Sequence, residues 1–77
     1  MRDEIVQLLN AGIQNEHVDV ELSGNHCTVV VVSDDFADLS RVKKQQKVYQ
    51  CLNEKIASGE IHALNIQAFT PAQWRER

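Results

Sequence analysis

The chain contains 77 residues, 43% of them hydrophobic and 25% charged, and its formal net charge is −3. A chain of this length has room for one domain, predicted here to span residues 1–77, with a thin hydrophobic core and little space for a deep catalytic pocket. The composition excludes a disordered chain, and the net negative charge argues against a surface that is basic overall.

The N-terminal segment and the cysteines indicate where the protein works. No basic start followed by an apolar run marks a secretion signal, and no window is apolar over the length that a membrane span requires. Two isolated thiols, Cys27 and Cys51, in a chain without such a signal are typical of reduced cysteines rather than of a disulfide. We therefore expect a cytoplasmic protein that makes no membrane contact.

The chain is predicted to begin with a helix and a strand. Apolar residues recur at helical spacing over residues 3–13, which predicts an amphipathic helix. Residues 17–23 alternate instead, with Val20 and Leu22 on one side, and this pattern predicts a half-buried strand. His17 falls on the polar side of that strand and is expected to face solvent.

A tight hairpin turn is predicted next. The Gly-Asn pair at residues 24–25 is typical of a two-residue turn, and a β-branched run follows it. A turn of this length pairs Leu22 with Cys27, which directs Cys27 toward the core and puts His26 on the opposite face. A longer loop would release both His26 and Cys27 from this arrangement.

A long helix is predicted in the second half of the chain. Residues 33–38 are polar apart from one Phe and are expected to form a loop. Ser40 can cap a helix that starts near Arg41 and ends at the Ser-Gly pair at residues 58–59. The apolar face of this helix is expected to carry Val42, Val48, Tyr49, Leu52 and Ile56.

A third strand and a short helix complete the predicted order. Residues 61–69 alternate, with His62 and Leu64 on one face and Ile61 on the other. Residues 70–73 (TPAQ) form a helix-start signal with a capping box. The order is therefore helix, strand, strand, helix, strand, helix, which predicts an α+β fold with a three-stranded sheet covered by helices.

No sequence motif indicates catalysis. The chain has no Gly-rich phosphate loop, no CxxC or HExxH pair and no serine nucleophile elbow. The three aspartates within residues 33–38 are expected to be solvated charges rather than an acid/base pair. We therefore expect a protein that works by binding and is not an enzyme.

Histidine and cysteine side chains are the candidate metal ligands. A neutral imidazole binds iron, zinc or copper and can share a metal with a thiolate or a second imidazole. His26 lies near the hairpin turn and His62 at the start of the third strand, although separated histidines are more often structural than ligands. Cys27 could join His26 as a second donor, whereas the hairpin register favours a buried thiol, and Cys51 is expected to pack.

Positive charge is concentrated in one short segment. Residues 1–38 contain one Arg and no Lys, whereas Arg41, Lys43, Lys44 and Lys47 follow closely upon one another. These side chains could contact the phosphates of a nucleic acid, with neighbouring glutamines available for base edges. The alternative is a solvated helix face, because such charges give electrostatic affinity without sequence specificity.

Three segments resemble one protein family. Residues 36–49 read FADLSRVKKQQKVY, residues 61–64 read IHAL, and residues 69–74 read FTPAQW. Together they strongly resemble the BolA family, and within it an acid-stress-associated paralogue, over nearly the whole chain. The resemblance implies a class II KH-like fold in the order α-β-β-α-β-α, which agrees with the order derived above from the residues.

The resemblance also implies a function and a site. BolA-like proteins partner monothiol glutaredoxins, and such pairs can share a bridging [2Fe-2S] cluster with glutathione. The histidine of the IHAL-type strand is the characteristic ligand of the family, which assigns that role to His62. The second ligand comes from the hairpin, where His26 matches and Cys27 stands in place of the usual aromatic neighbour. The chain alone is expected to be a monomer or a weak homodimer.

The same family implies a second interpretation, because it includes transcriptional regulators. On that interpretation Arg41, Lys43, Lys44 and Lys47 would contact DNA phosphates along the long helix. KH nucleic-acid modules generally use a GXXG loop, and no such motif occurs in this sequence. DNA binding therefore ranks second, behind a role in iron-sulfur trafficking or stress response.

Overall fold

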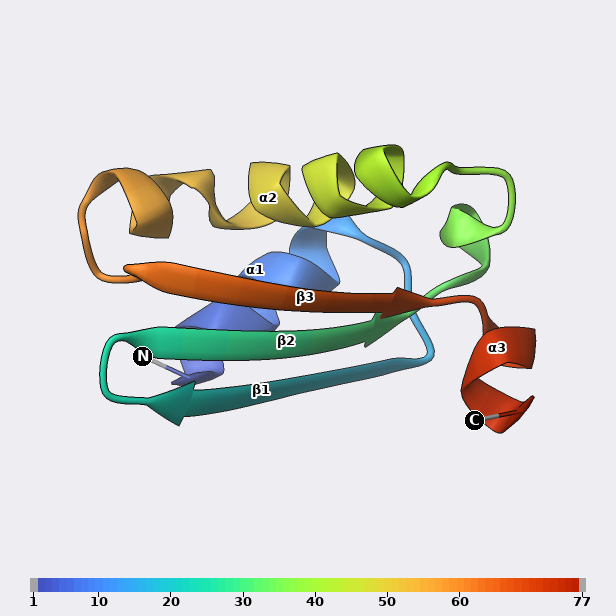
Figure 1. Ribbon diagram of the computed structural model, residues 1–77, viewed down its shortest axis with the longest axis horizontal. Helices are drawn as coiled ribbons and strands as arrows, with labels where there is room; N and C mark the ends of the chain where they lie inside the picture. Colours follow the sequence, from blue (N-terminus) through green and yellow to red (C-terminus); the bar gives the residue numbers. More distant parts are fainter. Residues whose placement is uncertain (1, 77) are drawn as a thin grey trace.

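The computed structural model describes residues 2–76, which form helices and the strands of one sheet (Figure 1). This order confirms the predicted α-β-β-α-β-α arrangement, with one 3-10 turn added inside the predicted loop. The two end residues of the predicted domain, Met1 and Arg77, lie outside the described residues. The elements are α1 (Arg2–Gly12), β1 (His17–Ser23), β2 (His26–Val32), η1 (Asp34–Phe36), α2 (Arg41–Ala57), β3 (Ala63–Phe69) and α3 (Pro71–Glu76).

The sheet has the strand order β1-β2-β3. β1 and β2 are antiparallel with Leu22 opposite Cys27, which confirms the predicted hairpin register. Gly24 has a φ of 58°, as the first central residue of a type II′ turn requires. β2 and β3 are parallel, so α2 crosses from one end of the sheet to the other. The β1–β2 turn and the loop before β3 therefore meet at one end of the sheet.

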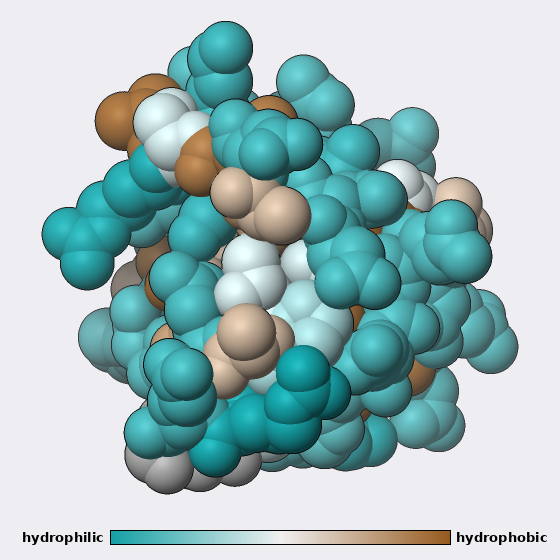
Figure 2. Space-filling view, turned by 90° about the vertical axis from the view of Figure 1, so that its right-hand side faces the viewer, coloured by the Kyte–Doolittle hydropathy of each residue, from teal (hydrophilic) through white to brown (hydrophobic). Residues whose placement is uncertain are grey.

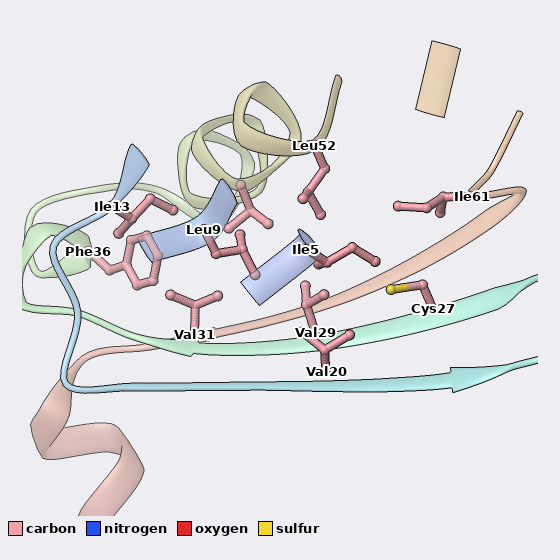
Figure 3. Packing of buried hydrophobic residues seen from close by; sticks show 11 residues of the cluster. Ile5, Leu9, Ile13, Val20, Cys27, Val29, Val31, Phe36, Leu52 and Ile61 are labelled. Atoms are coloured by element: carbon pink, nitrogen blue, oxygen red, sulfur yellow. The ribbon is translucent and has the colours of Figure 1, made fainter. Parts of the chain in front are cut away.

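α1 and α2 pack on the same face of the sheet and enclose the core with it (Figure 3). The other face is polar along β1, where Asp19 and Glu21 are exposed. The prediction of a helix-covered sheet thus holds for one face. The core of buried apolar side chains consists of Ile5, Leu9, Ile13, Val20, Cys27, Val29, Val31, Phe36, Val48, Leu52 and Ile61.

The apolar face of α2 is narrower than the sequence pattern predicts. Val48 and Leu52 are fully buried, but Val42 is 62% exposed and Tyr49 is 42% exposed. Val42 and Tyr49 lie about a quarter turn from the centre of the buried stripe, at 3.6 residues per turn. A three-stranded sheet offers too little surface to cover so wide an arc, so this part of the prediction is wrong.

The start of β3 also differs from the prediction. The strand begins at Ala63 rather than at Ile61, so His62 precedes it, and His62 is exposed whereas Leu64 packs against the core. Gly59, with a φ of 83°, lets the chain turn after α2, and the N–H of Ile61 then donates to the carbonyl of Lys55. This turn buries Ile61 in the core and leaves His62 exposed at a bend, so the strand alternation starts only after it.

The opposite end of the sheet is held by α3 and by Ser33. The capping box is confirmed, because Thr70 and Gln73 exchange two hydrogen bonds between side chain and backbone. Trp74 stacks on His17 at 5.0 Å between ring centroids, so this exposed histidine also has a packing role. Ser33 is buried, its N–H donates to the Phe69 carbonyl, and its hydroxyl donates to the Gln14 carbonyl.

Candidate functional site

Two histidines lie at the end of the sheet where the hairpin turn meets the loop before β3. His26 starts β2 and pairs in register with Ala63, the residue directly after His62. The carbonyl oxygen of Asn25 accepts the N–H of His62 at 3.3 Å and the N–H of Ala63 at 3.2 Å. Both histidine side chains are exposed. Backbone bonding therefore holds the two histidine-bearing segments together and leaves both imidazoles accessible.

Cys27 lies on the opposite face of β2 from His26. Alternation along β2 directs it into the core, where it is 2% exposed, and Figure 3 shows its sulfur between the sheet and the helices. Burial raises the pKa of the Cys27 thiol above its ordinary value. A neutral, enclosed thiol is a poor metal ligand because the thiolate is the form that binds metal. The structure thus groups His26 with His62 and places Cys27 elsewhere.

The two histidines do not form a complete metal site. No group of three or more His, Cys, Asp and Glu side chains within residues 2–76 could hold a metal ion. Iron-sulfur clusters take four protein ligands as a rule, and imidazole can replace thiolate at one iron. His26 and His62 alone therefore could supply at most two of the four ligands of such a cluster.

The predicted cationic residues do not form one surface. Arg41 and Lys44 line a groove of about 680 Å³ beside β3, and Lys43 and Lys47 are not part of its lining. Lys47 lies one helical turn before Cys51, whose thiol donates to the Lys47 carbonyl at 3.5 Å. Burial raises the pKa of this thiol, and the charge of Lys47 lowers it by a smaller amount. None of the ion pairs within residues 2–76 involves these four cations. Figure 2 shows a mostly hydrophilic surface at the end where α2 starts, with small separate apolar patches.

Sequence reasoning missed the groove beside β3. Its lining includes five consecutive residues, 65–69, together with glutamines of α2 and α3. The polar residues Asn65 and Gln67 were visible in the sequence, but alternation identifies only faces of a strand. Which strand lies at the edge of a sheet is set by tertiary pairing, which no local signal in the sequence reveals.

The fold is α+β and class II KH-like, as defined by the order of helices and strands and by a β1-β2-β3 sheet with helices on one face. The sequence profile of the family described as "BolA-like protein" matches residues 4–73. The chain belongs to this family, as the resemblance predicts. No helix within residues 2–76 has both the length and the apolar character that crossing a membrane demands.

Named relatives agree with this assignment. The "Acid stress protein IbaG" of Escherichia coli K12 is 44% identical over 94% of this chain and 86% of its own length. The "DNA-binding transcriptional regulator BolA" of Haemophilus influenzae is 39% identical over 82% of this chain and 63% of its own length. The structure of "BolA1 from Arabidopsis thaliana" superposes with a TM-score of 0.84 at 25% identity, covering 94% of this chain and 93% of that one.

Proposed function

We propose that this protein is a BolA-like adaptor that binds a monothiol glutaredoxin and shares a [2Fe-2S] cluster with it. The observation that carries the proposal is the pair of exposed histidines, His26 and His62, at one end of the sheet. In this proposal His62 is the principal iron ligand and His26 the second. Cys27 is left out of the ligand set because it is buried in the core.

The chain would act by presenting a preorganised half-site. The carbonyl of Asn25 holds the backbone of His62 next to β2, so both exposed imidazoles lie at the same end of the sheet. Glutaredoxin and its glutathione would supply thiolates from the other side of the interface. Replacing a thiolate by a neutral imidazole changes the charge and the reduction potential of such a cluster. The protein would then hold or relay a cluster without turning over a substrate.

Anaerobic reconstitution tests the proposal. The chain is mixed with a monothiol glutaredoxin, glutathione, iron and sulfide, and visible absorption and circular dichroism of the purified complex are recorded. The wild-type mixture should give a spectrum distinct from that of the glutaredoxin alone. His62→Ala should remove this difference, and His26→Ala should weaken it or alter its shape, because each variant deletes one imidazole donor.

His17 provides the matched control. It is an exposed histidine of the same sheet, but it lies at the opposite end and stacks on Trp74. His17→Gln should leave the reconstituted spectrum unchanged while the two other variants alter it. A spectrum of the complex that is indifferent to His62→Ala would refute the role given to that residue.

A second candidate function is DNA binding, favoured by the name of the Haemophilus relative and by four cations of α2 that join no ion pair within residues 2–76; they are Arg41, Lys43, Lys44 and Lys47. The affinity for DNA is measured over a range of salt concentrations, with Lys43→Ala/Lys44→Ala as the test variant. A clear salt dependence that this variant reduces would support phosphate contacts, since each contact releases counterions. Absence of binding at low salt would reject this function.

A further inference from the structure

β3 is an edge strand, and its outer edge is open. Within residues 2–76 the sheet ends at β3, which runs beside α2 (Figure 1). Ala63 donates its N–H to the carbonyl of Asn25, the residue directly before β2, and the carbonyl of Phe69 accepts the N–H of Ser33. The first and last residues of β3 therefore both direct their backbone groups toward β2.

The backbone groups of the alternate residues point the other way. In a parallel pair, every second residue of a strand bonds to the same neighbour. The backbone groups of Ala63 and Phe69 point toward β2, and so do those of every second residue between them. The remaining residues direct their N–H and C=O away from β2; they are Leu64, Ile66 and Ala68. The side-chain hydrogen bonds within residues 2–76 include none to these groups.

The groove beside β3 gives access to this edge. Successive side chains of a strand point to opposite faces, so a groove that touches residues 65–69 without a gap must run along the edge. Gln73 of α3 also lines the groove, and its side-chain oxygen accepts the N–H of Thr70 at 3.0 Å. The open backbone groups of Ile66 and Ala68 thus belong to residues that line the groove.

The charge of the groove identifies its occupant. Arg41 and Lys44 line it, no carboxylate does, and neither cation takes part in the ion pairs of residues 2–76. We infer that this groove docks an acidic, extended segment of a partner protein, which adds to β3 as a fourth strand. Main-chain hydrogen bonds would supply affinity, and carboxylates facing α2 would supply selectivity.

The geometry also specifies the pattern of that segment. Residues on one face of a strand recur at about 6.7 Å, whereas Arg41 and Lys44 are separated by a rise of about 4.5 Å along α2. Long cationic side chains can bridge this difference. Acidic residues at alternate positions would face Arg41 and Lys44, and the residues between them would lie beside the amides of Asn65 and Gln67.

Two other occupants fit less well. A second copy of this chain paired edge to edge would bring Arg41 and Lys44 of both copies together, and like charges in such positions are unfavourable. A nucleic acid would find two cations among the described residues that line the groove, and two cations neutralise few phosphates. The one aromatic residue of the lining, Phe69, is already packed against Trp74 at 5.6 Å between ring centroids.

The inference goes beyond the proposed cluster function and is tested without metal or glutaredoxin. A blocked peptide in which Glu alternates with Thr is titrated into the ¹⁵N-labelled chain, followed by amide chemical shifts. Binding should shift and protect from exchange the amides of Ile66 and Ala68. Arg41→Gln/Lys44→Gln should weaken binding about tenfold. Lys43→Gln/Lys47→Gln, with the same change of charge on the same helix, should weaken it less than about twofold.

Changes to the peptide separate strand addition from general charge attraction. Gln in place of Glu in the peptide should weaken binding as much as Arg41→Gln/Lys44→Gln does. N-methylation at one alternate set of peptide residues, but not at the other, should abolish binding. Equal losses in the two charge variants, tolerance of both methylation patterns, or no binding would overturn the inference. So would a single-stranded oligonucleotide that displaces the peptide at lower concentration. If Arg41→Gln/Lys44→Gln does not fold, Arg41→Gln alone, at an exposed position, replaces it.

Discussion

The backbone N–H of His62 lies 3.3 Å from the carbonyl oxygen of Asn25, so the loop before β3 is bonded to the hairpin turn while the His62 imidazole is exposed. The backbone of His62 therefore contributes to the fold, whereas its side chain does not. His62→Ala should change the free energy of unfolding by less than about 0.5 kcal/mol, because no buried contact is lost. Urea unfolding measures this value, and a loss well above it would mean that the imidazole also stabilises the fold.

Cys27→Ala should lower the stability of the protein and leave cluster binding intact, the opposite of what is expected for His62→Ala. The thiol is buried in the core, so its removal leaves a small cavity and should lower the free energy of unfolding by about 1 kcal/mol. The reconstituted cluster spectrum should persist at temperatures where the variant is folded. If the variant were as stable as wild type but gave no cluster spectrum, Cys27 would be a ligand.

Gly12→Ala should destabilise the protein, although Ala is the better helix former. A Cβ at residue 12 would be closer to the sulfur of Cys51 than van der Waals contact allows. Helix propensity favours Ala by about 1 kcal/mol, whereas overpacking of a fitted contact costs about 1–3 kcal/mol. We expect a net loss of about 1 kcal/mol in urea unfolding.

A double-mutant cycle isolates the cause of that loss. Cys51→Ala removes the sulfur and makes room for a methyl group on residue 12. In this background Gly12→Ala should become neutral or stabilising, with a coupling of about 1 kcal/mol or more between the two sites. If the two substitutions were additive, the loss would arise from the helix backbone and not from the contact between α1 and α2.

The stability of the protein should depend on acid through the ion pair between Lys55 and Glu4. The ammonium of Lys55 lies 2.6 Å from the Glu4 carboxylate and 3.1 Å from that of Glu60. The hydrogen bond and charge of Lys55 lower the pKa of Glu4 below its ordinary value of 4.5. The contribution of the pair is therefore complete above that value and is lost as the pH falls through the lowered folded-state pKa.

Glu4→Gln should remove this acid-dependent part and lower stability at neutral pH. The effect should be small and should shrink as salt is added, because Glu4 is exposed. Glu4 also raises the pKa of Lys55 from 10.5, so the pair weakens at high pH only as the pH rises through the raised value. The measurement is the urea midpoint of wild type and variant at a series of pH values. A difference between the two midpoints that stays constant with pH would contradict the prediction.

Local rules predicted those parts of the fold that local chemistry determines. The Gly-Asn turn set the hairpin register, Ser40 caps α2 by accepting the N–H of Lys43, and the Thr70–Gln73 box starts α3. Strand alternation failed at His62, because the turn after α2 interrupts it. Helical spacing failed at Val42 and Tyr49, because spacing cannot reveal how much of a helix a small sheet covers.

The candidate site could be predicted only in part. From the residues alone the histidines were ambiguous, and the family resemblance singled out His62 and His26. Alternation correctly directed Cys27 inward, but the resemblance kept it as a possible donor. The open edge of β3 and the contact between Gly12 and Cys51 depend on which elements become neighbours, and no short stretch of the sequence encodes either of them.

The parallel pairing of β2 with β3 also sets the time at which the histidines meet during folding. His26 and His62 are 36 positions apart (62 − 26) and become neighbours only after β3 has joined the hairpin. The β1–β2 hairpin closes through local contacts, whereas a contact across the α2 crossover carries the entropy cost of a long loop. During synthesis the pair cannot form until β3 has left the ribosome. A nascent or truncated chain that lacks β3 therefore presents single histidines, and the pair is a late product of folding.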